Sequence, residues 1–281
     1  MSRNVKLPFS SCFMHPLFNR KLYAMFCSPS HTYKLFVTVT SLWFTTRICF
    51  TIKFIKIGNL QSNMEIKNVP YIDDKEEKYA SCQGPPTLMM VLKHFLPGFK
   101  LTFDEVYDKL GYSKGEWFFE MYMVELLNKL GVSSKYYFTR KLTICLDSVC
   151  FREISGLDFN NERHKKEFNL EHYNSSVKYV INNNLSHHRN DLDIRFIKKQ
   201  IDNSKLVIVT VNRNKYLDKK RYKGHFMLIK GYTSDSFICN DAYFGENITI
   251  QFAKFLEMFY SINWISPQDK KKRTRDMVVV G

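Results

Sequence analysis

The sequence predicts an α+β fold in which a layer of helices comes first along the chain and an antiparallel sheet follows. Two observations support this prediction. Residues 86–130 repeat apolar side chains with helical spacing, and residues 206–241 contain short runs of β-branched and aromatic residues. Apolar residues make up 44% of the 281 residues, which is enough for a packed core. Helices that precede strands are typical of a two-layer core.

The first two expected helices have clear limits. Pro85 precedes Pro86, and a residue before proline avoids helical geometry, so we expect the first helix to begin at Pro86. The second helix should follow Thr102, which forms a capping-box pattern with Glu105, and should end at Gly111. The apolar face of the first helix comprises Leu88, Val91, Leu92 and Phe95.

A third helix is expected from about Trp117 to Leu130, and the pattern is weak from 140 to 190. A further helix should then begin at Asp191 or Asp193. Its apolar residues are Ile194, Ile197 and Ile201.

Strands are expected at 206–211, 224–232 and 236–241, because each is a short apolar run bounded by turn residues. A final amphipathic helix should bury one apolar face. That face comprises Phe252, Phe255, Leu256 and Phe259.

The charge of the chain is unevenly distributed. The formal net charge is +15, but residues 1–63 contain eight Lys and Arg residues and no Asp or Glu, which leaves +7 for the remainder. A nucleic-acid-binding protein would need a basic stripe interleaved with aromatic residues, or a recognisable module, and the sequence has neither. We therefore expect no nucleic-acid partner.

Residues 1–63 form an extension unlike the rest of the chain. Its apolar run at 35–57 is a poor transmembrane span because it contains Arg47, Lys53 and Lys56. It also lacks the cleavage site of a signal peptide. We favour translation from Met64, with a membrane anchor through 35–57 as the alternative. We expect a cytoplasmic protein, with a membrane partner only if the extension is part of it.

The remainder divides into one domain over 64–267 and a basic tail over 268–281. The seven cysteines are scattered without CxxC pairs, which argues for a reducing compartment and against a disulfide framework. Zinc needs convergent ligands, and only Cys145 with Cys150, or the doublet His187-His188, begins such a set. We expect no metal and no cofactor, and the sequence does not indicate an oligomeric state.

Three residues could form a cysteine-dependent catalytic site. Cys82 lies just ahead of the first helix, whose N-terminus favours a thiolate. His225 opens the strand at 224–232, and Asp241 ends the strand at 236–241. Because a tight turn joins these strands, we expect His225 and Asp241 at the same end of an antiparallel pair. There they could act as a base and as the group that orients it.

Two segments carry a resemblance to a known family. VPYIDDKEEKYASCQGPPTLMMVLKHF and GHFMLIKGYTSDSFICND resemble the papain-like cysteine peptidases that remove double-glycine leaders from bacteriocins, and the stand-alone domains similar to them. Those proteins show Cys-Gly-Pro before an apolar helix, and Gly-His-Phe before a strand. The resemblance spans about 69–262. It implies a papain-like fold, with Cys82 as nucleophile, His225 as base and Asp241 as orienting acid.

The sequence departs from that family at two positions. If the helix is aligned through MVLKHF, the family's cysteine falls on Gln83, and Cys82 requires one extra residue. The family's oxyanion-hole glutamine corresponds to about Asp74, whose carboxylate cannot donate a hydrogen bond unless protonated. We therefore expect Gln83 to supply this donor.

The resemblance leaves two functions open. The first is a thiol hydrolase that cleaves a peptide bond through an acyl-enzyme, with acyl transfer as a variant. The alternative is an inactive module on the same fold that binds an extended peptide between the helices and the sheet. Both imply a peptide or protein partner. No ATP-driven export module is expected, since the chain lacks a GxxxxGK[ST] loop.

Overall fold

The computed structural model describes residues 21–28, 31–39, 50–56, 63–73, 84–113, 115–139, 142, 144, 167–220, 222–260 and 274–281. The chain separates into two compact units, residues 1–61 and residues 62–281.

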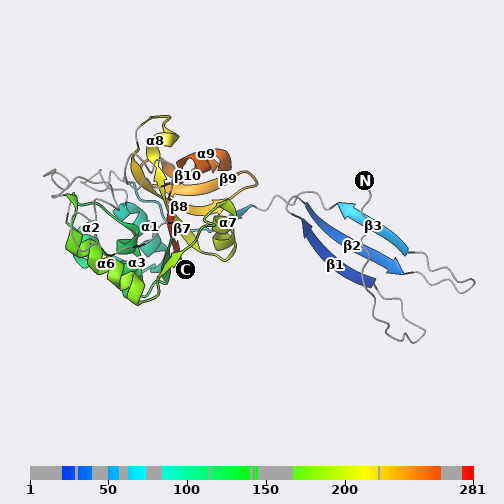
Figure 1. Cartoon of the computed structure of the whole chain (residues 1–281), viewed down its shortest axis with the longest axis horizontal. Helices are drawn as coiled ribbons and strands as arrows, with labels where there is room; N and C mark the ends of the chain where they lie inside the picture. The colour runs from blue at the N-terminus through cyan, green and yellow to red at the C-terminus, as the bar shows by residue number, and fades with distance from the viewer. Residues whose placement is uncertain are drawn as a thin grey trace, which may run out of the picture. The chain divides into compact units, whose positions relative to one another are not determined.

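The first unit contains an antiparallel sheet in the order β1-β2-β3 (Figure 1). Its strands are β1 (Lys21–Ser28), β2 (His31–Val39) and β3 (Phe50–Lys56). The apolar run at 35–57 falls partly in β2 and β3, and its residues 40–49 lie outside the described residues. In the part of the chain that the structure describes, no helix combines the length and hydropathy that crossing a bilayer requires.

The second unit is built on a mostly antiparallel sheet with the strand order β10-β9-β8-β7-β11-β5-β6, and β4 pairs with β8. Among the described strands of this sheet, only β5 and β6 pair in parallel. The strands are β4 (Met64–Glu65), β5 (Ser134–Phe138), β6 (Ser186–His188), β7 (Leu206–Asn212), β8 (Gly224–Tyr232), β9 (Ser236–Asp241), β10 (Gly245–Gln251) and β11 (Asp276–Val280).

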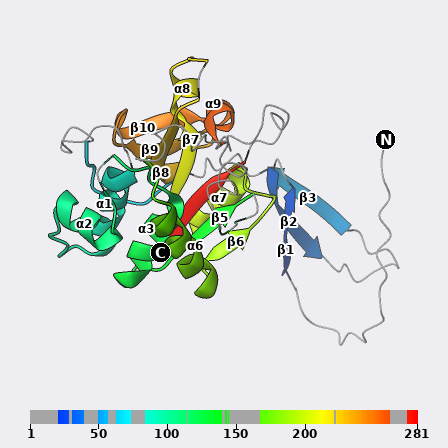
Figure 2. The same ribbon diagram turned by 60° about the vertical axis from the view of Figure 1, so that its left-hand side comes forward.

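Helices cover both faces of this sheet. Figures 1 and 2 show one group of helices on one side and a second group on the other. The first group is α1 (Gly84–Phe95), α2 (Phe103–Leu110), α3 (Glu120–Lys129) and α6 (Leu170–Asn182). The second comprises α7 (Ile194–Asp202) and α9 (Phe252–Met258), and the short α8 (Arg213–Tyr216) follows β7.

The alternation of side chains along the central strands explains this arrangement. Leu206 and Ile208 of β7 belong to the core cluster under α1, α2, α3 and α6, whereas Val207 and Val209 belong to the cluster under α7 and α9. The predicted helical layer on a sheet is therefore present. The structure adds a third layer to the expected two, because a second group of helices buries the other face of the sheet.

The first two helices follow the sequence prediction closely. α1 begins at Gly84, two residues earlier than expected. Its prolines are tolerated because N–H groups in a first turn have no intrahelical acceptor. The capping box of α2 is confirmed, since Thr102 N–H donates to Glu105 Oε2 at 2.7 Å and Glu105 N–H donates to Thr102 Oγ1 at 3.3 Å. Gly111 ends α2 with φ of 64°.

The third helix is shorter than predicted, because Trp117 is bound elsewhere. The Trp117 indole donates to Glu167 Oε2 at 3.1 Å, and its backbone N–H donates to the Glu167 carbonyl at 2.6 Å. These contacts connect the residues before α3 to those before α6.

The region with a weak pattern contains elements that the sequence analysis missed. α6 buries Tyr173, Val177 and Val180 at helical spacing, and Asn169 caps it by accepting from His172 N–H at 3.0 Å. The doublet His187-His188 lies in the strand β6. Among the described residues, no group of His, Cys, Asp or Glu is arranged to hold a metal ion. Cys145 and Cys150 lie outside the described residues.

The later elements that the sequence predicts are present, apart from the orientation of Leu256, whereas β10 was not predicted. β7, β8, β9, α7 and α9 occur where expected, with Asp193 as the N-cap of α7. Leu256 of α9, predicted to face the core, is 37% exposed. Burial of Met258 replaces it in the core.

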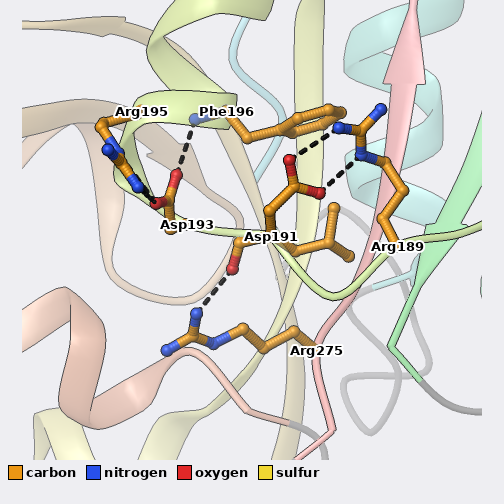
Figure 3. Close-up of polar contacts among 7 residues, drawn as sticks. Arg189, Asp191, Asp193, Arg195, Phe196 and Arg275 are labelled. Carbon is orange, nitrogen blue, oxygen red and sulfur yellow. Dashed lines mark hydrogen bonds and ion pairs between the residues drawn. The ribbon is translucent and has the colours of Figure 1, made fainter.

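The prediction that residues 268–281 form a tail is wrong for residues 276–280, which form the buried strand β11 between β7 and β5. Arg275 helps to hold this strand, because its Nη1 donates to the Leu192 carbonyl at 2.6 Å (Figure 3). Its backbone N–H donates to Thr139 Oγ1 at 2.7 Å. Burial of each Val of β11 stabilises the fold by about 2 kcal/mol. A solvated tail would lack this stabilisation.

Candidate active site

The central feature of the site is a buried pair formed by His225 and Asp241. His225 is the second residue of β8 and Asp241 is the last residue of β9, and the two strands pair antiparallel. The structure therefore brings these two residues to the same end of the sheet, as the sequence predicts. His225 Nε2 lies 2.6 Å from Asp241 Oδ2, and both side chains are fully buried.

The surroundings of Asp241 set the direction of this hydrogen bond. Asp241 Oδ1 accepts the backbone N–H groups of Tyr243 and Phe244, at 2.9 Å and 3.0 Å. An ionised carboxylate only accepts hydrogen bonds, so Oδ2 accepts from Nε2–H of His225. This tautomer leaves the lone pair of the imidazole on Nδ1.

His225 Nδ1 is buried and has no hydrogen-bond partner among the described residues. An unsatisfied buried nitrogen is costly, so its presence calls for an explanation. In a cysteine-dependent site, a lone pair held in this way is suited to accept the proton of a thiol.

Aromatic side chains cover the His225–Asp241 pair. The imidazole of His225 makes edge contacts with the rings of Tyr243 at 6.4 Å and Phe244 at 5.8 Å. Phe244 also packs on Tyr216 of α8, at 4.4 Å. Tyr243 is 47% exposed, so the cover presents an aromatic surface to solvent beside the pair.

Packing brings the beginning of α1 close to the beginning of β8. An added Cβ at Gly84 would lie 2.2 Å from Phe118 Cδ1, so the Phe118 ring lies directly on the first residue of α1. The Phe118 ring then makes an edge contact at 6.0 Å with Phe226, the residue after His225. The absence of a side chain at Gly84 is what permits this close approach.

A second segment leads toward the same end of the sheet. β4 pairs antiparallel with the far end of β8, and Ile66 N–H donates to the Lys230 carbonyl at 2.8 Å. Farther along, Asn240 Nδ2 donates to the Val69 carbonyl at 3.3 Å. Residues 64–69 therefore run along the sheet toward the end that holds His225 and Asp241.

In the sequence, the predicted nucleophile, Cys82, comes after residues 64–69 and before α1. Cys82, Gln83 and Asp74 are outside the described residues, which stop at residue 73 and resume at Gly84. Gln83 is the residue immediately before α1 and Cys82 is one residue earlier.

A buried cation, Arg213, lies next to the aromatic cover. Its side chain is 8% exposed, and its guanidinium carbon lies 4.1 Å from the centre of the Tyr243 ring. The Nε atom is buried and has no hydrogen-bond partner among the described residues.

Sequence reasoning missed Arg213, Tyr243 and Phe244. The signal for Arg213 was the run of basic residues that separates the predicted strands at 206–211 and 224–232.

One solved structure to which this chain is similar is that of a protein assigned as a C39-like peptidase from Bacillus anthracis. It shows 11% sequence identity and a TM-score of 0.43, and the match covers 78% of this chain and 97% of that chain. Among curated proteins, none matches the sequence significantly.

The family assignment comes from the sequence of the second unit. Residues 66–266 match the Peptidase_C39 like family, and this range contains Cys82, His225 and Asp241. The α+β architecture, with helices that precede a mostly antiparallel sheet, is consistent with the papain-like fold of that family. The chain therefore belongs to the Peptidase_C39 like family.

Proposed function

We propose that the protein is a cysteine peptidase that cleaves a peptide bond of a peptide or protein substrate. Family membership supports this class of reaction. The observation that carries the proposal is the state of His225, whose Nε2 is bound to Asp241 while its buried Nδ1 has no partner among the described residues. A base oriented in this way needs only a thiol to complete a catalytic triad.

In the proposed reaction, Cys82 is the nucleophile. Its proton moves to His225 Nδ1 as its sulfur bonds to the substrate carbonyl carbon. The imidazolium then donates this proton to the leaving amine as the peptide bond breaks. Water, with His225 again as base, hydrolyses the acyl-enzyme and regenerates the thiol. Asp241 keeps the imidazole in the required tautomer throughout.

Stabilisation of the oxyanion is assigned to residues near the start of α1. The Gln83 side-chain amide can donate a hydrogen bond, whereas Asp74, at the usual position of this donor, cannot when ionised. The N-terminus of α1 also favours negative charge on the thiolate and on the oxyanion.

A second candidate function has its own supporting observation. Because α1 begins at Gly84, Gln83 occupies the position immediately before the helix, where the resemblance places the family's cysteine. If Cys82 cannot reach His225, the domain is an inactive module that binds an extended peptide.

Alkylation of the full-length protein distinguishes the two functions. Iodoacetamide is added at a series of pH values, and mass spectrometry identifies the modified cysteines. A thiolate paired with an imidazolium reacts well below the pH of about 8.5 at which an ordinary thiol reacts. We expect early reaction at Cys82, and loss of that reaction in His225→Ala.

Cys239 provides an internal control within the same protein. It is fully buried, and burial, together with the nearby charge of Asp241, raises the pKa of its thiol. It should therefore stay unmodified while Cys82 reacts. In parallel, wild type and Cys82→Ala are incubated with a peptide mixture, and cleavage should occur only with wild type.

The result that contradicts the peptidase proposal is an ordinary pH profile at Cys82 that His225→Ala does not change. The double variant Cys82→Ser/Gln83→Cys then tests the alternative directly. Early alkylation of the new thiol, dependent on His225, would place the competent position at 83 and support the inactive binding module.

A further inference from the structure

A concentration of positive charge lies beside the His225–Asp241 pair and has no role in the proposed reaction. Residues 213–223 contain six Lys and Arg residues and a single acid, Asp218. Asp218 is itself bound by Lys254 of α9, at 2.6 Å. This segment therefore presents a local excess of positive charge next to the candidate site.

Arg213 is the most informative member of this group. Its guanidinium remains charged at every relevant pH, and burial of a charge without a partner is strongly unfavourable. Among the described residues, Arg213 forms no ion pair, and its buried Nε has no hydrogen-bond acceptor. The stacking on Tyr243 offsets only part of the cost of desolvation. An anion that binds at Arg213 would supply the missing partner.

Arg213 lies close to His225, the proposed base. Tyr243 contacts both Arg213 and His225: its ring centre lies 4.1 Å from the guanidinium carbon and 6.4 Å from the centre of the imidazole. The guanidinium therefore lies within about 11 Å of the imidazole, a span of about three extended residues. A group bound at Arg213 would belong to a residue close to the scissile bond.

Lys223, the residue immediately before β8, adds a second positive charge. Arg213 N–H donates to the Lys223 carbonyl at 2.9 Å, and Lys223 N–H donates to Asn212 Oδ1 at 3.0 Å, so the two backbones are fixed side by side. Partial burial lowers the pKa of Lys223, and the positive charges of Arg213 and Lys219 lower it further. The Lys223 side chain is exposed and can reach a ligand.

We infer that Arg213 and Lys223 form a subsite for a carboxylate of the substrate, within about three residues of the scissile bond. A guanidinium binds a carboxylate through two parallel hydrogen bonds. The positive charge of Lys223 would attract the carboxylate further and repel cations. The carboxylate comes from an Asp or Glu side chain or from a free C-terminus. This inference rests on the proposed function, since it assumes a peptide ligand.

The experiment measures binding separately from cleavage. Four fluorescent peptide libraries are prepared, with Glu or Gln at a fixed position and with a free or an amidated C-terminus. Fluorescence anisotropy gives their affinity for full-length His225→Ala protein, which lacks the proposed base. Wild-type protein is tested with the same libraries for cleavage.

The variants Arg213→Gln and Lys223→Gln, each in the His225→Ala background, test the subsite. We expect Arg213→Gln to weaken binding of carboxylate-bearing peptides by about tenfold or more, because a hydrogen bond to a charged group contributes about 1.5–3 kcal/mol. Binding of the amidated Gln library should not change. Lys178→Gln, which removes an exposed charge from α6, is the matched control and should have no effect.

Each outcome has a defined meaning. Preference for Glu whatever the C-terminus assigns a side-chain carboxylate, and preference for the free C-terminus alone assigns the terminal one. Equal affinity for all four libraries, or affinities that neither variant changes, overturns the subsite. Because Lys223 is exposed, its variant tests the subsite even if Arg213→Gln is unstable in thermal unfolding. Carboxylate-dependent binding without any cleavage supports the subsite and contradicts the peptidase proposal. Cleavage without a carboxylate preference supports the peptidase proposal and contradicts the subsite.

Discussion

At the scale of single residues, the helical layer contains a half-buried histidine, His172, remote in sequence from the candidate triad. The His172 ring stacks on Tyr122 with 4.0 Å between ring centres and an interplanar angle of 6°. Its Nδ1 is buried without a partner among the described residues. Burial lowers the pKa of His172, although the charges of Glu116 and Glu125 act in the opposite direction. The folded structure therefore favours the neutral form of this histidine.

The lowered pKa of His172 predicts a pH-dependent stability. The unfolded chain binds a proton near pH 6.5 and the folded protein binds it only at lower pH, so stability is complete above that pH and decreases as the pH falls. His172→Phe keeps an aromatic ring on Tyr122 but removes the titration. Urea unfolding at pH 7 and pH 5 should show a smaller loss of stability for this variant than for wild type.

His188→Gln serves as the control for this measurement, because it removes an exposed histidine from β6 and should keep the wild-type response. Equal losses of stability in wild type and His172→Phe would show that His172 does not contribute.

At the scale of secondary-structure elements, one glycine determines how α1 meets the rest of the helical layer. Gly84 begins α1 under the Phe118 ring, and Phe118 also contacts Tyr122 of α3 and Phe226 of β8. The position of α1 relative to β8 depends on this contact.

Substitution of Gly84 by alanine should therefore destabilise the protein. The new methyl group would lie 2.2 Å from Phe118 Cδ1, and the ring would have to move within a packed core, at a cost of about 1–3 kcal/mol. Gly98→Ala is the control, since no heavy atom lies within 4 Å of its added Cβ. Urea unfolding of both variants measures the difference, and equal stabilities would contradict the packing described for α1.

At the scale of the whole molecule, the last residues of the chain complete the sheet of the second unit. β11 lies between β7 and β5, so the strands on its two sides meet only through it. Its side chains enter both core clusters, with Val278 and Val280 on one face and Met277 and Val279 on the other.

Removal of residues 274–281 should therefore abolish cooperative folding, because it exposes two inner strands and opens both clusters. Removal of residues 1–61 should leave the unfolding transition of the second unit intact, since residues 62–281 form a compact unit with these two clusters. Circular dichroism during thermal unfolding compares the two truncations with full-length protein. A cooperative transition at the wild-type temperature after removal of β11 would refute this prediction.

Much of the fold could be predicted because the relevant signals are local. The capping box at Thr102, the helix after Asp193 and the strand β8 each depend on residues within a few positions of one another. β11 was missed because its short valine run follows a strongly basic segment. The partners that bury it, β7 and β5, are far away in the sequence.

The sequence by itself determined the order of helices and strands, the family resemblance and the approach of His225 to Asp241, because a tight hairpin joins the strands that carry them. Only the tertiary structure decided that helices bury both faces of the sheet, that β11 completes it, and that Arg213 lies buried over Tyr243 next to the pair. Spacing along a chain reports contacts that hairpins and helical turns create. Contacts between distant segments, and the burial of a charge among them, arise only when the complete core has formed.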